Sequence, residues 1–305
     1  MSSLRTGTNL DGVPTVHLES RFLEVEVAPS VGGRIVSLIH NATGSELLWR
    51  NHALRLQRLS AGSEYDPNFY GGIDELLPND MPETIDGVPC PDHGELWTTG
   101  LDWHEIDSGI KLSGTLPGFG LGYERTMALG AERPRLDFNY RITNLTDQPR
   151  HFLWKLHAAL AVEAGDLIEC PARKAQVVDL AWSRQKSAEP FPWPELQGNQ
   201  VNVVPAPDGT MDFFYLFDLS EGRLALHRPR SGLRLEYHFD ARVFPYAWVF
   251  ASYGGFLSHY TVILEPCTAM PMSVNEAAKL GQCAVLAPGE TLTTEVSIRV
   301  GPSKL

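Results

Sequence analysis

The clearest signal along the chain is an alternation of apolar and polar residues with a period of two. It recurs in five separate runs of ordinary strand length: 16–20, 22–27, 136–142, 233–239 and 292–300. Alternation of this kind is typical of strands with one face buried and the other in solvent. We therefore predict a protein built mainly of half-buried antiparallel strands.

Short clusters of Gly, Pro, Asn and Asp separate the predicted strands, for example at 41–44, 144–149 and 287–290. These residues favour turns because they adopt unusual φ angles or hydrogen-bond to their own backbone. The best helical pattern is the segment 273–280, which ends at Gly281. Many strands, short turns and very little helix predict an all-β fold of the antiparallel sandwich type.

Two long segments carry no strand pattern. One extends from about Ser60 to Trp97 and is rich in acids, Gly and Pro, and the other extends from about Ser187 to Asp212. Long segments without regular structure in a compact domain are usually functional, so we expect the first to wall a pocket. Because no repeat or domain boundary interrupts the pattern, we predict a single domain over residues 1–305.

Composition and charge narrow the functional classes. The formal net charge of −12 argues against nucleic acid and anionic membrane as partners, because both need a basic surface. The N-terminus is polar, and no apolar run approaches the ~20 residues of a membrane span. Four widely spaced cysteines without a CxxC pair predict free thiols in a reducing compartment. We expect a cytoplasmic protein, either a monomer or a homodimer.

Ten histidines raise the question of a metal site. No HxH, HExxH or regular Cys/His spacing occurs, so the sequence defines no metal centre and we expect none.

Several segments, taken in order, resemble the galactose mutarotase-like superfamily, which includes the aldose 1-epimerases. They are Gly-Gly-Arg-Ile-Val-Ser-Leu at 32–38 with Thr-Gly-Ser-Glu-Leu-Leu-Trp at 43–49, Pro-Asp-His-Gly-Glu-Leu-Trp at 91–97, Asn-Leu-Thr at 144–146 before Phe-Leu-Trp-Lys-Leu-His at 152–157, Ala-Ser-Tyr-Gly-Gly at 251–255 with Val-Ile-Leu-Glu-Pro-Cys-Thr-Ala-Met-Pro at 262–271, and Leu-Ala-Pro-Gly-Glu at 286–290. Together they cover nearly the whole chain. The resemblance implies an antiparallel β-supersandwich, in agreement with the strand pattern.

The resemblance also implies a mutarotase that interconverts the α and β anomers of a sugar without a metal or cofactor. Opening the cyclic hemiacetal requires a base at the anomeric hydroxyl and an acid at the ring oxygen. By the resemblance, Glu265 is the base, His157 is the acid, and His93 donates a hydrogen bond to the ring oxygen or a neighbouring hydroxyl. Alternation places Glu265 on the same strand face as Ile263, so if both faces are buried its carboxylate needs a partner or a function.

Arg34 is the candidate that orients the catalytic cluster. The loop acids Asp74, Glu75, Asp80 and Asp92 are candidates to hold hydroxyl groups or a cation, and the rings of Trp97, Trp248 and Tyr253 are candidates to stack on a sugar face. Asp240 is the candidate counterpart of the aspartate that grips hydroxyls in the family. Each also has a structural interpretation, which is pairing for the arginine, solvation for the acids and core packing for the rings. Typical galactose mutarotases carry an Asn-Arg pair where this chain has Gly-Gly-Ile-Asp-Glu at 71–75, which leaves the sugar open.

Two alternatives remain open. A non-catalytic carbohydrate-binding or sensing protein on the same fold would not need Glu265 and His157 to face one ligand. An epimerase for a phosphorylated or sulfonated hexose would need an arginine cluster at the rim of the pocket. The available arginines are Arg34, Arg55, Arg58 and Arg125.

Overall fold

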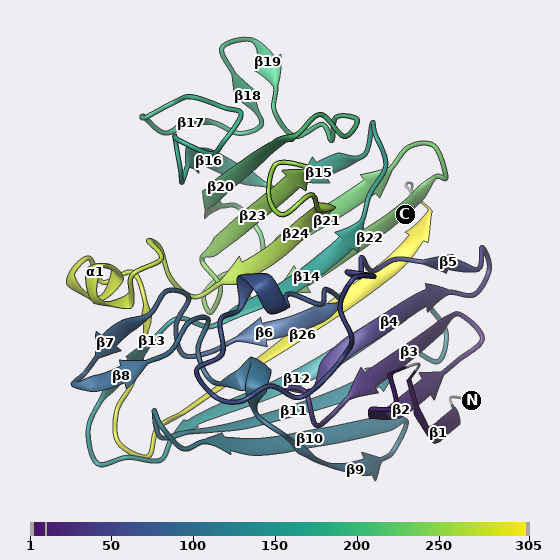
Figure 1. Cartoon of the computed structure of the whole chain (residues 1–305), viewed down its shortest axis with the longest axis vertical. Helices are drawn as coiled ribbons and strands as arrows, with labels where there is room; N and C mark the ends of the chain where they lie inside the picture. The colour runs from purple at the N-terminus through teal and green to yellow at the C-terminus, as the bar shows by residue number, and fades with distance from the viewer. Residues whose placement is uncertain (1–2, 10, 303–305) are drawn as a thin grey trace.

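Antiparallel strands dominate the computed structural model, which describes residues 3–9 and 11–302 (Figure 1). The larger sheet has twelve strands in the order β1-β2-β3-β4-β6-β14-β24-β23-β20-β16-β17, with β5 paired to β4. Their bounds are β1 (Ser3–Thr8), β2 (Pro14–Glu19), β3 (Leu23–Ala28), β4 (Arg34–His40), β5 (Ser45–Glu46), β6 (Ile73–Leu76), β14 (Lys155–Ala161), β16 (Ala172–Val177), β17 (Phe191–Pro192), β20 (Thr210–Leu219), β23 (Tyr246–Tyr253) and β24 (Tyr260–Cys267).

A second sheet has eight strands in the order β15-β21-β22-β26-β12-β11-β10-β9. Their bounds are β9 (Asp102–Ile106), β10 (Gly109–Leu116), β11 (Leu121–Leu129), β12 (Arg135–Asn144), β15 (Leu167–Glu169), β21 (Arg223–Arg228), β22 (Leu233–Phe239) and β26 (Thr291–Pro302). Short two-stranded ribbons complete the β-structure. They pair β7 (Glu83–Ile85) with β8 (Val88–Cys90), β13 (Arg150–Phe152) with β25 (Ala284–Leu286), and β18 (Glu195–Leu196) with β19 (Asn199–Gln200).

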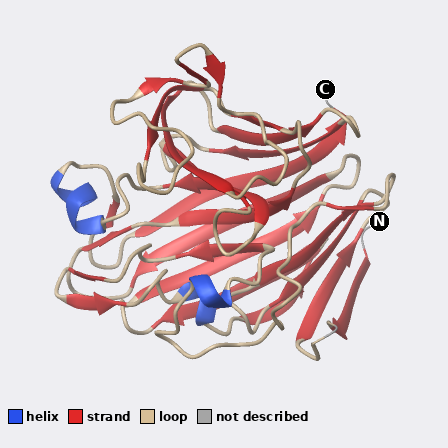
Figure 2. Cartoon of the chain, turned by 45° about the horizontal axis from the view of Figure 1, so that its top comes forward, coloured by secondary structure: helices blue, strands red, loops and turns tan. Residues whose placement is uncertain are grey.

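Helix is scarce in the described part of the chain (Figure 2). It comprises two single 3₁₀ turns, η1 (Asp66–Asn68) and η2 (Leu96–Thr98), and one α-helix, α1 (Val274–Lys279). The hydroxyl of Ser273 caps α1 by accepting a hydrogen bond from the backbone N–H of Glu276. This confirms the helix predicted at 273–280. No helix among the described residues is both long enough and apolar enough to cross a membrane.

All five alternating runs form strands, namely β2, β3, β12, β22 and β26. Alternate side chains of β12 are buried along its whole length, which is the pattern that the sequence showed. Alternation therefore identified the strands with one solvated face correctly.

The two segments without a strand pattern do contain short strands, so that part of the prediction is wrong. The segment 60–97 includes β6, β7 and β8, and the segment 187–212 includes β17, β18, β19 and the start of β20. Strands of two to four residues are too short to show alternation. In β6 all four residues are buried, so its Asp and Glu resemble loop acids in the sequence although they belong to the sheet.

One hydrophobic cluster, which contains side chains from Val16 to Val300, draws on both sheets. Its largest fully buried side chains include Trp154, Tyr123 and Phe244. This continuity supports our proposal of one domain over residues 1–305. All four cysteines are free thiols.

Candidate active site

A cavity of about 180 Å³ lies between the middle strands of the larger sheet and the segment 60–97. Its lining residues are Tyr65, Asp66, Phe69, Asp80, His93, Lys155, His157, Phe213, Phe250, Phe256, His259, Thr261, Ile263, Glu265 and Met272. The segment 60–97 contributes the first five of these, so it does wall a pocket as expected. The volume is below the ~300–1,000 Å³ of drug-sized sites, which suits one small molecule.

Sheet register brings the two predicted catalytic side chains to the same face. β14 and β24 pair Lys155 with Cys267 and Ala158 with Leu264, which places His157 across from Glu265. Along β24, Ile263 and Glu265 line the cavity. Both faces of β24 are buried, so the Glu265 carboxylate is a buried charge that needs a partner.

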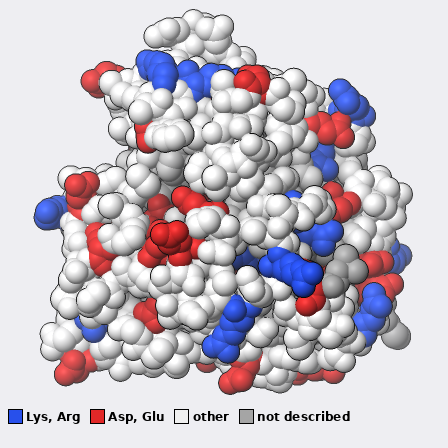
Figure 3. Space-filling view, in the orientation of Figure 1, with Lys and Arg blue, Asp and Glu red and all other residues white. Residues whose placement is uncertain are grey.

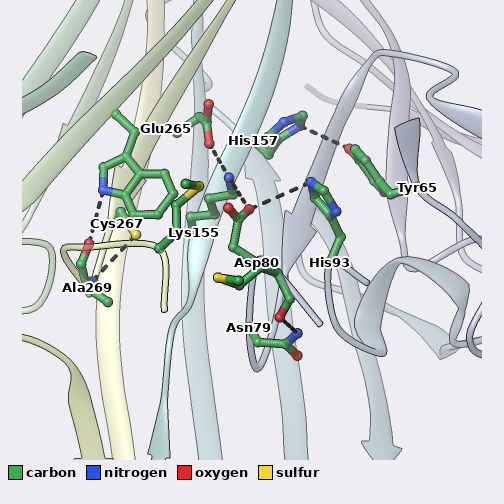
Figure 4. A network of polar contacts seen from close by, with 12 residues as sticks. Tyr65, Asn79, Asp80, His93, Lys155, His157, Glu265, Cys267 and Ala269 are labelled. Atoms are coloured by element: carbon green, nitrogen blue, oxygen red, sulfur yellow. Dashed lines mark hydrogen bonds and ion pairs between the residues drawn. The ribbon is translucent and has the colours of Figure 1, made fainter. Parts of the chain in front are cut away.

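Lys155 is that partner (Figure 4). Its ammonium Nζ lies 2.6 Å from Oε2 of Glu265 and 2.7 Å from Oδ1 of Asp80, and all three side chains are buried. Burial alone would lower the pKa of Lys155, but Asp80 and then Glu265 raise it, so the amine stays protonated. Burial likewise would raise the pKa of Asp80, but Lys155 and then His93 lower it overall. The pairing keeps Lys155 and Asp80 charged at the cavity wall at neutral pH.

A second network orients His157. Its Nδ1 lies 2.9 Å from Oδ1 of Asp74, and the hydroxyl of Tyr65 donates to Oδ2 of the same carboxylate at 2.8 Å. Arg34 completes the network with an ion pair of 2.7 Å to Oδ2 of Asp74 and a hydrogen bond from Nη1 to the carbonyl of Gly71. Burial would raise the pKa of Asp74, but Arg34 and then His157 lower it to about 2. Asp74 is therefore a carboxylate that holds Nδ1, which leaves Nε2 of His157 for a ligand.

His93 reaches the cavity from a strained turn. Its φ is +57°, its backbone N–H donates to the carbonyl of Asp80, and its ring stacks on Tyr65 with centroids 4.0 Å apart. Gly94 makes this turn possible, because a Cβ there would lie 2.3 Å from the carbonyl oxygen of Leu77. The close approach explains physically why the sequence has glycine after His93.

Two carboxylates flank the imidazole of His93. Its Nδ1 lies 2.8 Å from Oδ1 of Asp92, and its Nε2 lies 3.7 Å from Oδ1 of Asp80. Burial would lower the pKa of His93, but the hydrogen bond to Asp92 and then the charge of Asp80 raise it overall. His93 is therefore suited to donate a hydrogen bond.

The described residues contain no group of three or more His, Cys, Asp or Glu side chains arranged to hold a metal ion. The polar groups at the cavity form ion pairs and hydrogen bonds with one another instead (Figure 4).

Comparison with known proteins identifies the fold. Residues 10–79 match a family described as a domain of unknown function (DUF5107). No curated protein matches the chain in sequence. A galactose mutarotase-like protein from Clostridium acetobutylicum has a TM-score of 0.73 at 15% identity, covering 98% of each chain. An aldose epimerase homologue from C. elegans has a TM-score of 0.63 at 13% identity, covering 99% of each chain.

The chain has the galactose mutarotase-like fold. This confirms the antiparallel β-supersandwich with very little helix that the sequence predicted. The same fold occurs within larger proteins. A TPR-domain containing protein from Parabacteroides distasonis matches with a TM-score of 0.70 at 14% identity, covering 94% of this chain and 47% of that one.

On this galactose mutarotase-like scaffold, the predicted catalytic residues Glu265, His157 and His93 all line one cavity. Asp74 and Arg34 lie behind it, where they hold His157. Asp80 is at the cavity wall, and Asp92 supports His93.

Glu75 does not line the cavity. It follows Asp74 on β6 and points to the other side of the sheet, where Tyr123, Arg125, Tyr140 and Trp154 all donate hydrogen bonds to its carboxylate. Its contacts are those of a buried structural acid. We therefore propose no contact between Glu75 and a sugar.

The predicted aromatic platform also lies outside the cavity lining. Trp97 packs edge-on against Tyr65, and the fully buried Trp248 lies beneath Lys155, whose Nζ is 4.7 Å from the ring centroid. Tyr253 is fully buried. Asp240 forms an ion pair with exposed Arg242 in the turn after β22. The core-packing interpretation fits the three rings, and surface pairing fits Asp240.

Sequence reasoning missed most of the cavity. The missed residues are Tyr65, Asp66, Phe69, Lys155, Phe213, Phe250, Phe256, His259, Thr261, Ile263 and Met272. Lys155 alone left a usable signal, because in Lys-Leu-His it shares a strand face with His157. The aromatic residues resemble ordinary core residues in the sequence.

Proposed function

We propose that this protein is an aldose 1-epimerase of the mutarotase type, which interconverts the anomers of a small sugar by general acid–base catalysis. One observation carries the proposal: Glu265 and His157 face the same cavity from neighbouring strands, and each has its own charged partner. A protein that only binds sugar does not need a carboxylate and an imidazole that face one ligand, whereas acid–base ring opening requires both.

In the proposed reaction, the Glu265 carboxylate removes the proton of the anomeric hydroxyl, and Nε2–H of protonated His157 gives its proton to the ring oxygen. The bond between the anomeric carbon and the ring oxygen breaks, which yields the open-chain aldehyde. After rotation about the adjacent carbon–carbon bond, neutral His157 takes the proton of the attacking hydroxyl, and Glu265 returns its proton to the carbonyl oxygen. Both residues then have their starting protonation states.

The surrounding residues position this pair. Lys155 holds the Glu265 carboxylate from the side, and Asp74 fixes the ring of His157 through Nδ1. His93 lines the same cavity, which supports the proposal that it donates a hydrogen bond to the ring oxygen or a neighbouring hydroxyl. Positioned proton transfer contributes typically ~10²–10⁴-fold for each group.

The alternative of a phosphorylated or sulfonated hexose receives no support from the arginines. Arg34 is paired with Asp74 and Arg125 with Glu75. Arg55 lines a separate small recess. Among the described residues that line the cavity there is no arginine.

We further propose a small neutral carbohydrate as the ligand and a cytoplasmic location, with no nucleic-acid or membrane partner. The fold of the neighbours, the acidic balance of the chain and its free thiols support these proposals.

Anomer exchange measured by NMR saturation transfer on a panel of aldoses tests the function. Wild type should accelerate exchange, and Glu265→Gln and His157→Asn should each lose about 10²-fold or more of it. The exposed residues His104 and Glu105 on β9 provide matched controls, because His104→Asn and Glu105→Gln make the same chemical changes away from the cavity. If wild type accelerates no sugar but binds one measurably, the protein is a non-catalytic sugar-binding protein.

A further inference from the structure

The face of the sheet that carries the catalytic pair is divided into rows, and the next row is apolar. Glu265 pairs with Trp248 across β24 and β23, whereas two residues away Ile263 pairs with Phe250 and Phe250 pairs with Phe213. Residues two apart on a strand point to the same face and are separated by about 7 Å. An apolar row therefore begins one step along the strands from the carboxylate that would bind the anomeric centre.

Phe256 packs against Phe250 and enlarges this row into a wall of the cavity. We call Phe213, Phe250, Phe256 and Ile263 the apolar wall. Its rings contact one another edge to face: the centroid of Phe250 is 5.6 Å from that of Phe213 and 5.1 Å from that of Phe256. The three rings are only half-buried, so part of each faces the open cavity. An apolar group of the ligand that covers this surface would remove it from water, which is favourable.

Hydrogen-bonding groups near the apolar wall are few. Thr261 already donates its hydroxyl to the carbonyl of Leu160. His259, whose ring centroid is 6.0 Å from that of Phe256, offers one donor and one acceptor when its ring is neutral. Among the described lining residues there is no Asn or Gln. A sugar hydroxyl placed against Phe213 and Phe250, rather than beside the His259 ring, would lose its water without gaining an equivalent partner.

The charges of the cavity oppose an anionic ligand. Asp66, Asp80 and Glu265 line it, and Lys155 is bound between the last two of these. On the face of the molecule that Figure 3 shows, carboxylates gather on the left at mid-height, and most lysines and arginines lie toward the right side and the top. A phosphate or sulfonate would meet three carboxylates and no arginine among the described lining residues, and the lysine is already bound by two of those carboxylates.

We propose that the site takes a neutral sugar whose edge remote from the anomeric carbon is apolar, which means a deoxy or O-methylated sugar. The inference rests on the proposed function, because that function fixes the anomeric end beside Glu265 and His157. A ring held there extends along the strands toward the apolar wall, which receives a methyl, methylene or methoxy group. A pocket of this kind discriminates against an added hydroxyl by about 10–100-fold in kcat/KM.

Matched pairs of sugars test the inference. Exchange rates and binding constants are measured for galactose and 6-deoxygalactose, for glucose with 6-deoxyglucose and 3-O-methylglucose, and for glucose 6-phosphate. At least one deoxy or O-methyl sugar should exceed its parent by about 10-fold or more in kcat/KM, and the phosphate should not exceed glucose. Equal or better exchange of the parent sugars, or faster exchange of the phosphate, overturns the proposal.

Binding separates this inference from the proposed function. If no sugar exchanges faster with the protein but the deoxy or O-methyl sugars still bind more tightly than their parents, the specificity stands and the mutarotase function fails. If parent hexoses exchange as fast as their deoxy counterparts, the function stands and the specificity fails.

A variant of the apolar wall gives a second measurement, which does not require the natural sugar to be known. Phe256 lies half-buried in the turn after β23, so Phe256→Asn should fold and should reduce the preference for the apolar sugar by several-fold. Phe22→Asn is the control, since Phe22 is also half-buried but lies in the turn before β3. An unchanged preference in Phe256→Asn, with both variants folded, would show that the wall does not select the substrate.

Discussion

Two adjacent carboxylates, Asp74 and Glu75, make the most informative comparison in this molecule. Both lie on β6, both are buried, and each forms an ion pair of 2.7 Å with a buried arginine. Asp74 pairs with Arg34 and holds His157 at the cavity, whereas Glu75 pairs with Arg125 and collects hydrogen bonds from the opposite sheet. Strand alternation alone sends one carboxylate to the candidate site and the other to the core.

The comparison teaches that burial and charge pairing do not identify a functional residue. What distinguishes the two acids is the neighbour that each one holds. Asp74 orients His157, which lines the cavity, and we propose that Asp74 is a positioning residue. Glu75 joins the two sheets through Tyr123 and Arg125 of β11 and Tyr140 of β12. The two roles should therefore be separable by mutation.

The largest effect is expected for Asp74→Asn, which should lower both activity and stability. The amide leaves Arg34 without its counterion, which costs about 3–5 kcal/mol of unfolding free energy. Its NH₂ group also presents a donor to Nδ1 of His157, which favours the wrong tautomer and should lower kcat by about 10²-fold. Urea unfolding and anomer exchange on the folded fraction measure the two effects. A variant that loses stability but keeps its kcat would contradict the positioning role.

Glu75→Gln should lower stability alone. Arg125 loses its charged partner, so the unfolding free energy should fall by about 3–5 kcal/mol. The kcat per folded molecule should stay within about twofold of wild type, because Glu75 contacts no residue that lines the cavity through the hydrogen bonds that the structure shows. A large loss of kcat in folded Glu75→Gln would mean that the two networks are coupled.

The pH dependence of the unfolding free energy should reveal the lowered pKa of Asp74, with a smaller effect than either substitution above. The folded-state pKa of Asp74 is about 2 and its ordinary value is 3.8, so its ionisation contributes stability above about pH 4 that is lost as pH falls through 2. Nearly two pKa units correspond to about 2 kcal/mol. The difference in unfolding free energy between wild type and Asp74→Asn should therefore shrink by about that amount from pH 5 to pH 2. A constant difference over this range would refute the lowered pKa.

The comparison also shows where the sequence was sufficient. The alternation along 262–266 placed Glu265 on the face of Ile263, and the structure puts both at the cavity. The long alternating runs became strands, and the capped helix α1 formed where expected. These features depend on local periodicity, which one sequence displays directly.

The features that were not predicted from the sequence depend on the pairing register between strands and on strands of very few residues. Asp74 and Glu75 would have been assigned to opposite faces had β6 been recognised, but four buried residues show no alternation. The apolar wall joins Phe213, Phe250 and Ile263 from three strands, and no single strand reveals that they align. Alternation in Lys-Leu-His put Lys155 on the face of His157, but its role became clear only with its partners Asp80 and Glu265, which are distant in the sequence.

The smallest effects are expected from removing one hydroxyl group from the Asp74 network and one from the Glu75 network. These changes test most directly whether the two networks act separately. The hydroxyl of Tyr65 donates to Asp74 at 2.8 Å, and that of Tyr140 donates to Glu75 at 3.0 Å. Each Tyr→Phe change should cost about 1.5 kcal/mol of unfolding free energy, since the acceptor is charged and buried. Tyr65→Phe should also lower kcat/KM several-fold, because Asp74 then holds His157 less firmly, whereas Tyr140→Phe should leave it unchanged.

A double-mutant cycle decides whether the kinetic effect of Tyr65 passes through the imidazole. If it does, Tyr65→Phe should have little further effect on exchange in a His157→Asn background, because the group it positions is already missing. Tyr140→Phe should leave exchange unchanged in both backgrounds. Full additivity for Tyr65 would mean that its hydroxyl acts on the reaction independently of His157.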